Sequence, residues 1–159
     1  MIFCKIAGGA ILLLSALLLA NYKNKSAALE ITRVDGFLAF FKFMRDKIDC
    51  YVLTVPEIFS RCDRETLYAC GLENDLKPKT ISEFFSLSDV RGEGLLRILD
   101  AFEADFGKSY KDTEIRLLDR YISMLEDEKK RLEAALPSRK RLNLTLLIAL
   151  ATAIIILLI

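Results

Sequence analysis

The sequence predicts an all-α protein, a cytoplasmic helical bundle of about five helices flanked by two transmembrane helices. Apolar residues recur at three- and four-residue steps through the middle of the chain, which is the period of amphipathic helices. Only 7 Gly and 3 Pro occur, too few for a turn-rich all-β fold. Every charged side chain except Lys5 lies within residues 21–141. We therefore expect an N-terminal transmembrane helix at 1–20, a cytoplasmic α-helical domain ending in a long amphipathic helix at 21–141, and a C-terminal transmembrane helix at 142–159.

The C-terminal segment is the clearer of the two expected spans. Residues 142–159 carry no charge and only three polar side chains, Asn143, Thr145 and Thr152. As a helix this segment is about 27 Å long at ~1.5 Å per residue, close to the ~30 Å hydrocarbon core of a bilayer. We therefore expect it to cross once.

The N-terminal segment is uncharged over residues 6–20. It becomes long enough to cross if residues 2–4 join it while Lys5 extends its ammonium group to the lipid headgroups. The alternative is a secretory signal peptide cleaved after Ala20. Signal-peptide cleavage after Ala20 would also require a small residue two positions earlier. Leucine stands there, at position 18, and its size favours a retained span.

Basic residues set the expected orientation in the membrane. They cluster just before the C-terminal span, whereas no charged side chain follows it. Because cytoplasmic flanks carry the excess of Lys and Arg, we expect a multi-pass cell-membrane protein with its domain in the cytoplasm and both termini outside. The cluster is also placed to touch anionic membrane lipid. It consists of Lys129, Lys130, Arg131, Arg139, Lys140 and Arg141.

The first helix of the domain is expected to start near Ala27, with Ser26 as its N-cap. Two phenylalanines, Phe40 and Phe43, widen its apolar face, so we place this helix centrally in the bundle. Gly36 within it costs ~1 kcal/mol relative to Ala. The apolar face follows the helical period and consists of Val34, Phe37, Leu38, Phe41, Met44 and Ile48.

A second helix is expected to begin with Thr54 as N-cap and Pro56 in its first turn. It runs to Cys70 and ends at Gly71. The following residues, 72–80, are interpreted as a connection because they contain Asn, Asp and Pro.

A short helix containing Phe84 and Phe85 comes next, with either Thr80 or Ser82 as its start. Residues 88–94 then form a break. Two glycines in it, at positions 92 and 94, indicate a turn.

Two longer helices complete the domain. Apolar spacing predicts a helix over residues 95–106 that stops at Gly107, a residue able to take the left-handed conformation. A long helix follows from residues 109–112, with Lys129 in one expected apolar slot of its heptad pattern. Pro137 and Ser138 are expected to interrupt it as a hinge. The heptad positions are Ile115, Leu118, Ile122, Leu125 and Leu132.

The opposite face of the long helix is charged, with acidic residues first and basic residues last. This order suits the helix dipole and predicts pairs such as Glu126 with Lys130. One interpretation is the solvated face of a packed helix, and the other is a docking face for another protein. The face consists of Glu126, Asp127, Glu128, Lys129, Lys130, Arg131 and Glu133.

The chain offers little catalytic chemistry. It has no His, no recognisable catalytic carboxylate pair, no phosphate loop, no GxGxxG and no nucleophile elbow. Its net charge of +1 provides no long-range field for nucleic acid or anionic substrates. We therefore predict a protein that is not an enzyme, with no catalytic, cofactor-binding or metal-binding residues and neither nucleic acid nor a small-molecule substrate as partner.

Four cysteines occur, at Cys4, Cys50, Cys62 and Cys70, without a CxxC pair, so a zinc site is not expected. In a reducing cytoplasm the three cysteines of the domain are expected to be free and mostly buried thiols. The alternative is a membrane-bound thiol enzyme that uses Cys50, Cys62 or Cys70.

The order of parts along the whole chain is distinctive: a short span, a helical domain, a long last helix and a terminal span. Its most specific part is 95–136, where an apolar helix ends in Phe106 and Gly107 and a polar break leads into the long helix. This arrangement resembles the stage III sporulation protein AB family. That family usually has Leu where Phe106 stands and Asp with Gln in the next stretch, which here reads KSYKDTE, and its last span usually contains glycines.

The resemblance implies a mother-cell protein in the membrane around the developing forespore, within the channel complex that connects the two cells. Its domain would be similar to the helical F-type platform domain of type II secretion systems. The implied partners are a cytoplasmic secretion-type ATPase and other membrane proteins of the channel. An F-type subunit of a secretion or pilus system outside sporulation is the alternative.

Overall fold

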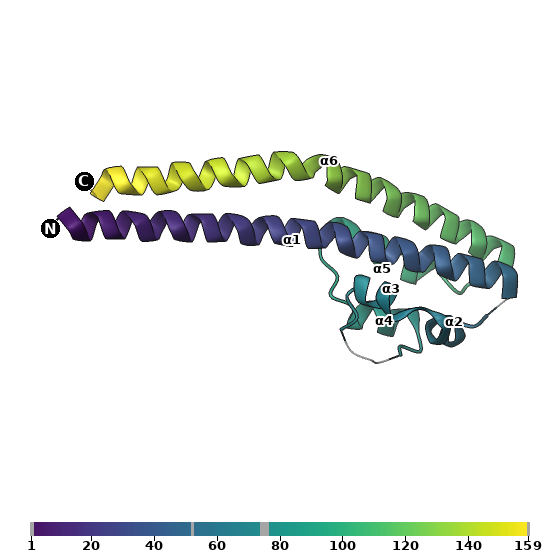
Figure 1. The fold of residues 1–159 in the computed structure, drawn as a ribbon. Helices are drawn as coiled ribbons and strands as arrows, with labels where there is room; N and C mark the ends of the chain where they lie inside the picture. The colour runs from purple at the N-terminus through teal and green to yellow at the C-terminus, as the bar shows by residue number, and fades with distance from the viewer. Residues whose placement is uncertain (1, 52, 74–76, 159) are drawn as a thin grey trace. The chain divides into compact units, whose positions relative to one another are not determined.

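The structure is a computed structural model that describes residues 2–51, 53–73 and 77–158. Toward both ends of the chain it describes the backbone but not many of the side chains. The fold is all-α, as expected, and the described residues contain helices and no strand (Figure 1). The helices are α1 (Ile2–Tyr51), α2 (Val55–Arg61), α3 (Arg64–Ala69), α4 (Ile81–Leu87), α5 (Glu93–Asp105) and α6 (Lys111–Leu158).

The chain divides into two compact units. One contains residues 29–132 and holds the short helices α2 to α5. The other combines residues 1–28 with 133–159, where the first part of α1 and the last part of α6 lie side by side (Figure 1). Both long helices therefore contribute residues to both units.

The expected helix start at Ser26 is wrong, because α1 continues from Ile2 to Tyr51 without a break. A serine caps a helix only where the preceding chain leaves the helical conformation. Neither Gly nor Pro stands between Gly9 and Ser26 to cause such a departure. The backbone hydrogen bonds simply continue from the apolar segment into the domain.

The expected interruption of the helix at Pro137 and Ser138 is also wrong, because both residues lie inside α6. Proline removes one backbone hydrogen bond and costs about 3 kcal/mol in a helix interior. Here Pro137 is a single unfavourable residue between long stretches rich in Leu, Arg and Lys, which are strong helix formers. The helix therefore continues through the proline.

Among the residues whose side chains the structure describes, no helical stretch is both long and apolar enough to cross a bilayer. Most side chains of the two expected spans, 1–20 and 142–159, are not among those that the structure describes.

The expected helix over residues 54–70 is two helices. Thr54 is the N-cap of α2, as predicted, and its backbone N–H donates to Glu57 Oε2 at 2.8 Å. At Cys62 the backbone leaves the helix and becomes extended. Asp63 then caps α3 by accepting a hydrogen bond from the backbone N–H of Thr66 at 2.9 Å. The Asp63 carboxylate thus takes the backbone N–H of Thr66, which a continuing helix would use for its own hydrogen bond, and α2 ends before it.

The end of α3 at Gly71 is confirmed. Gly71 has φ +98°, and its N–H donates to the carbonyl of Tyr68 at 2.9 Å. Thr80, and not Ser82, is the N-cap of α4, because its Oγ1 accepts from the N–H of Glu83 at 3.1 Å. Each of these polar groups satisfies a helix-end backbone group that has no partner within the helix.

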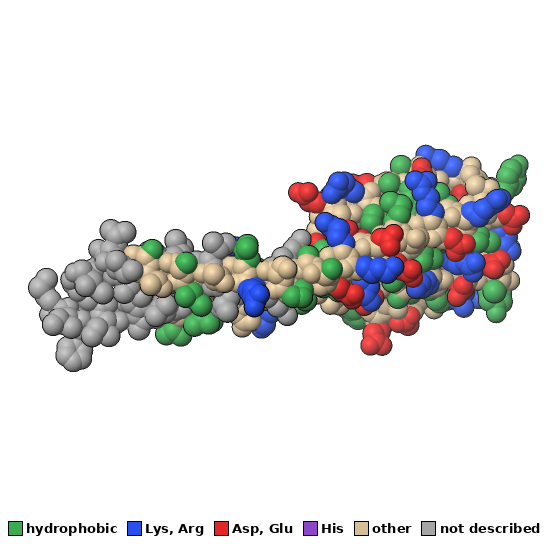
Figure 2. All heavy atoms as spheres, turned by 90° about the horizontal axis from the view of Figure 1, so that it is seen from above, with side chains coloured by type: hydrophobic (Ala, Val, Ile, Leu, Met, Phe, Trp, Pro, Cys, Tyr) green, Lys and Arg blue, Asp and Glu red, His purple; other side chains and the backbone are tan. Residues whose placement is uncertain are grey.

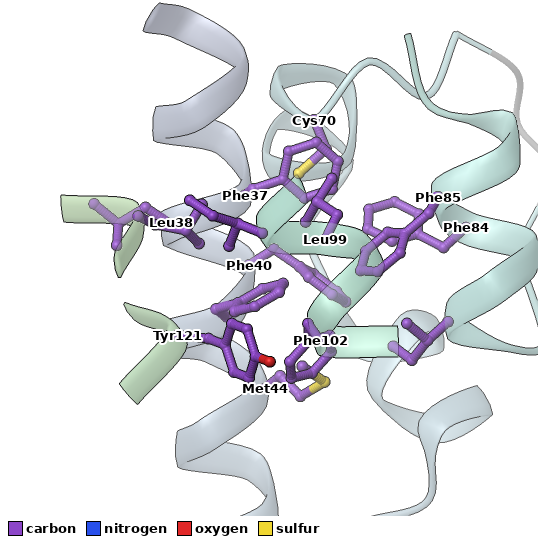
Figure 3. Close-up of a cluster of buried hydrophobic side chains, with 14 of the residues drawn as sticks. Phe37, Leu38, Phe40, Met44, Cys70, Phe84, Phe85, Leu99, Phe102 and Tyr121 are labelled. Atoms are coloured by element: carbon purple, nitrogen blue, oxygen red, sulfur yellow. The ribbon is translucent and has the colours of Figure 1, made fainter. Parts of the chain in front are cut away.

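Phenylalanine side chains form the centre of the core in the 29–132 unit (Figure 3). The ring of Phe84 in α4 lies 4.8 Å from that of Phe40 in α1 and 5.1 Å from that of Phe59 in α2. Phe102 of α5 lies 4.5 Å from Phe41 of α1. Such aromatic pairs contribute about 0.5–1.5 kcal/mol each beyond their buried area. The central place predicted for the first helix of the domain is confirmed.

Gly36 shows why α1 can sit so centrally. A Cβ at this position would collide with the backbone of Ala69 and lie 2.6 Å from the backbone N of Cys70. The end of α3 therefore packs directly on the α1 backbone. The helix propensity lost at Gly36 permits this close approach.

Helices α5 and α6 close the core. As predicted, α5 ends just before Gly107, which has φ +81°. The heptad positions of α6 are buried at Leu118, Ile122, Leu125 and Leu132, while Ile115 is half-buried. Tyr121 is buried beside them and donates to Asp105 Oδ2 of α5 at 2.8 Å.

Candidate protein-docking site

The charged face of α6, one expected docking surface, is largely used within the domain. Lys42 of α1 donates to Glu126 Oε1 at 2.8 Å, and Lys129 donates to Asp35 Oδ1 at 2.7 Å. The hydrogen bond from Lys42 lowers the pKa of Glu126, and the expected partner Lys130 adds only a smaller effect of its charge. Lys129 stands in a heptad position because its ammonium group finds a carboxylate on the neighbouring helix α1.

Two more residues of this face pair with each other and lie against the start of α5. The guanidinium of Arg131 contacts both oxygens of Glu128 at 2.7 and 2.6 Å, and Glu128 is only 9% exposed. A Cβ at Gly94 would collide with the Glu128 carboxylate. Gly94 therefore serves close packing of α5 on α6, where the sequence suggested only a turn.

What remains of the charged face is mixed in sign. In Figure 2 basic and acidic side chains are interspersed over one side of the molecule, without a large area of one charge. Asp127 and Lys130 are exposed and lie 3.5 Å apart as an ion pair within α6. This arrangement fits the solvated face of a packed helix better than a docking surface.

The cysteines differ in exposure. Cys50 is exposed, contrary to the expectation of mostly buried thiols, whereas Cys62 is half-buried and Cys70 is buried. Burial and the neighbouring Asp63 raise the pKa of Cys62 to about 12, and burial also raises the pKa of Cys70 well above its usual value. Because the thiolate is the nucleophile, these raised pKa values favour the unreactive protonated form of both thiols at neutral pH.

A groove between α4 and α5 has a volume of about 400 Å³. Its apolar lining comes from Phe85 and Leu99, which are buried, and from Val90 and Leu96, which are exposed in part. Leu96 is 48% exposed, a large fraction for a leucine on a helix that packs in a core. The apolar floor is thus open to a second molecule.

Polar groups line the rest of this groove, hereafter the α4/α5 groove. Asp100 and Glu103 of α5 are exposed at it and no basic residue lines it. The hydroxyls of Ser86 and Ser88 already donate to carbonyls of their own helix at 2.9 and 2.8 Å. The groove therefore offers mainly hydrogen-bond acceptors and negative charge.

The α4/α5 groove can bind a bulky apolar side chain that is accompanied by a cation or another hydrogen-bond donor. The apolar spacing that predicts a helix over residues 95–106 does not separate the exposed Leu96 from the buried face of that helix. The signal was the row Leu96, Asp100 and Glu103, which share one helix face at steps of four and three residues.

No catalytic centre or metal site was expected, and none is proposed. In the part of the chain that the structure describes, no three Cys, Asp or Glu side chains gather to hold a metal ion. No known protein family, curated protein or solved structure matches this chain.

Proposed function

We propose that this chain is a non-enzymatic membrane platform subunit of the channel complex between mother cell and forespore that sporulation requires. In this role it anchors, or couples to, a cytoplasmic secretion-type ATPase. The proposal rests on the resemblance to the stage III sporulation protein AB family, and on the charge pattern of the chain.

The charge pattern is the observation that carries the membrane part of the proposal. Residues 6–20 and 142–159 contain no charged side chain, whereas basic residues cluster immediately before the second stretch. Two crossings with this asymmetry hold the domain on the mother-cell cytoplasmic side. A secretion-type ATPase in that compartment can reach it.

The architecture of the domain supports a platform. Helix α1 supplies Phe37, Phe40 and Phe41 to the core, and α6 supplies Leu118 and Leu125. The same two helices carry the uncharged ends of the chain. A domain tied to the membrane through its own core helices can pass on a force applied by a partner without any chemistry of its own.

A pull-down of the tagged full-length chain from sporulating cells tests this function. We expect a secretion-type ATPase and other membrane proteins of the channel to be recovered. A matched control replaces Phe84 by Asp, which puts a charge in the aromatic core and unfolds the domain. Recovery of neither the ATPase nor a channel protein by the folded chain would sink the proposal.

The alternative, an F-type subunit of a secretion or pilus system outside sporulation, shares the same helical domain. The timing of expression separates the two. Expression confined to sporulation supports the proposal, and constitutive expression next to genes of a pilus or secretion system supports the alternative.

A further inference from the structure

We propose that the α4/α5 groove binds the α5–α6 turn of a second copy of this chain, with Tyr110 in the groove and Lys108 beside its acidic rim. This inference goes beyond the proposed function, because such self-association would hold whatever complex the chain serves. Both halves of the contact lie in the 29–132 unit.

The turn presents an aromatic ring to solvent. Tyr110 is 92% exposed, the largest exposure among the large hydrophobic side chains described. Lys108 two residues earlier is also exposed. Tyrosine and lysine together supply an apolar body, a hydroxyl donor and a positive charge.

The turn is also held in one conformation. Glu114 of α6, which is 7% exposed, accepts hydrogen bonds at its Oε1 from the backbone N–H groups of Gly107 and Ser109, at 3.1 and 2.9 Å. Gly107 lies in open space, with no atom near the place of a Cβ. A fixed and unobstructed turn loses little conformational entropy on binding.

The groove has the complementary chemistry. Phe85, Leu96 and Leu99 provide an apolar floor, while Asp100 and Glu103 supply negative charge. Its serine hydroxyls largely donate elsewhere and can accept a hydrogen bond from the phenol. The ring of Tyr110 therefore matches the apolar floor, its hydroxyl matches the serine acceptors, and the charge of Lys108 is opposite to that of the two carboxylates.

Other exposed aromatic side chains of the 29–132 unit fit less well. Tyr51 is 62% exposed, but the ammonium group of Lys47 lies over its ring and over that of Phe43, at 5.5 and 5.1 Å. Tyr68 is only 49% exposed. Tyr51 thus already has a cation over its ring, and Tyr68 offers less open surface than Tyr110.

Sedimentation of the full-length chain in detergent micelles tests the contact. We expect Tyr110→Ala, Lys108→Glu and the pair Asp100→Lys with Glu103→Lys each to weaken self-association by roughly tenfold or more. A triple variant that joins Lys108→Glu to both groove substitutions reverses both charges, and we expect it to restore association. Tyr68→Ala and Lys77→Glu are matched controls that leave association unchanged.

A photo-crosslinker at position 110, in a mixture of ¹⁴N- and ¹⁵N-labelled copies, locates the contact. We expect crosslinks between a light and a heavy copy that join position 110 to the segment 82–103. A monomeric wild-type chain, a triple variant that stays dissociated, or crosslinks confined to one copy or to other segments would each overturn the proposal. These outcomes leave recovery of an ATPase untouched, so failure here is distinct from failure of the platform function.

Discussion

At the scale of single residues, Arg33 joins three parts of the domain. Its side chain is nearly buried, and its Nη1 donates to the carbonyl oxygens of Tyr68 and Ala69 at 2.9 and 3.2 Å. Its Nη2 lies 3.4 Å from Asp89 Oδ2. A cation at the carboxyl end of a helix satisfies carbonyl groups that have no helical partner. Arg33 on α1 thus fixes α3 and the loop before α5.

Replacing Arg33 by Met tests this role. We expect the free energy of unfolding to fall by about 2–3 kcal/mol, because the variant keeps the aliphatic bulk but loses hydrogen bonds from a charged donor. Urea titration of the full-length chain in detergent, followed by circular dichroism, measures the change. Arg45→Met is the control: Arg45 pairs with Asp119 near the surface, and its loss should have a much smaller effect.

Thiol reactivity is set residue by residue. With the pKa of Cys62 raised to about 12, almost none of this thiol is ionised at pH 8, while Cys50 is exposed. We therefore expect iodoacetamide to alkylate Cys50 first and to leave Cys62 and Cys70 unmodified until the domain unfolds. Peptide mapping of the native and urea-unfolded chain checks the order. Rapid alkylation of Cys62 in the native chain would favour a thiol enzyme instead.

At the scale of elements, side-chain caps set where the short helices begin. Helices of six or seven residues, such as α3 and α4, have little stability of their own. Asp63 and Thr80 each accept a hydrogen bond from the third residue of the helix that follows. Packing of Leu67 and Phe84 into the core then holds both helices.

The cap of α3 predicts a pH dependence. The hydrogen bond from the Thr66 backbone N–H, together with that from the Thr66 hydroxyl, lowers the pKa of Asp63 below its ordinary value of 3.8. The folded state therefore binds the proton more weakly than the unfolded state, so the stabilisation is present above pH 3.8 and is lost as the pH falls through the lowered folded value.

We expect Asp63→Ala to cost about 0.5–2 kcal/mol of unfolding free energy at pH 7. Asp63→Asn keeps a capping oxygen and should cost less, and its difference from the wild type should vanish below the folded pKa of Asp63. Urea titrations at pH 7 and at a series of pH values descending from 3.8 measure both effects. A difference between Asp63→Asn and the wild type that grew on acidification would contradict the assignment.

The two long helices α1 and α6 run antiparallel within the 29–132 unit. Ion pairs join Asp35 to Lys129, Lys42 to Glu126 and Arg45 to Asp119, so the residue number rises on one helix as it falls on the other. These pairs lie near the surface, where each contributes little stability. They instead fix the register of the two helices above the aromatic core.

At the scale of the whole molecule, the proposed topology assigns different compartments to two native cysteines. Cys50 lies in the exposed part of the domain, and Cys4 belongs to the first proposed span near an outward terminus. In protoplasts of non-sporulating cells that express the chain, we expect a membrane-impermeant maleimide to leave Cys50 unlabelled and a permeant maleimide to label it. Cys50→Ser is the control for the assignment of the label. Labelling of Cys50 by the impermeant reagent would invert the topology and remove the proposed function.

Much of the fold follows from local patterns in the sequence. The helical period of apolar residues predicted the core face of α1, and glycines 71 and 107 predicted two helix ends with positive φ. The missed features depend on distant partners. The partner of Glu126 was misjudged, and the ion pair of Lys129 was not foreseen, because no local pattern shows which helix faces these residues.

The sequence by itself determined the all-α class, the apolar faces of the helices and most helix ends, since these follow from side-chain spacing and from residues that disfavour a helix locally. Only the tertiary structure decided that Gly36 admits the backbone of α3, that Arg33 caps it and that Leu96 is left open beside Asp100. The physical reason is the range of the interactions. Capping and periodicity act over a few residues, whereas close packing, ion pairing and grooves arise between residues that the chain brings together only when it folds.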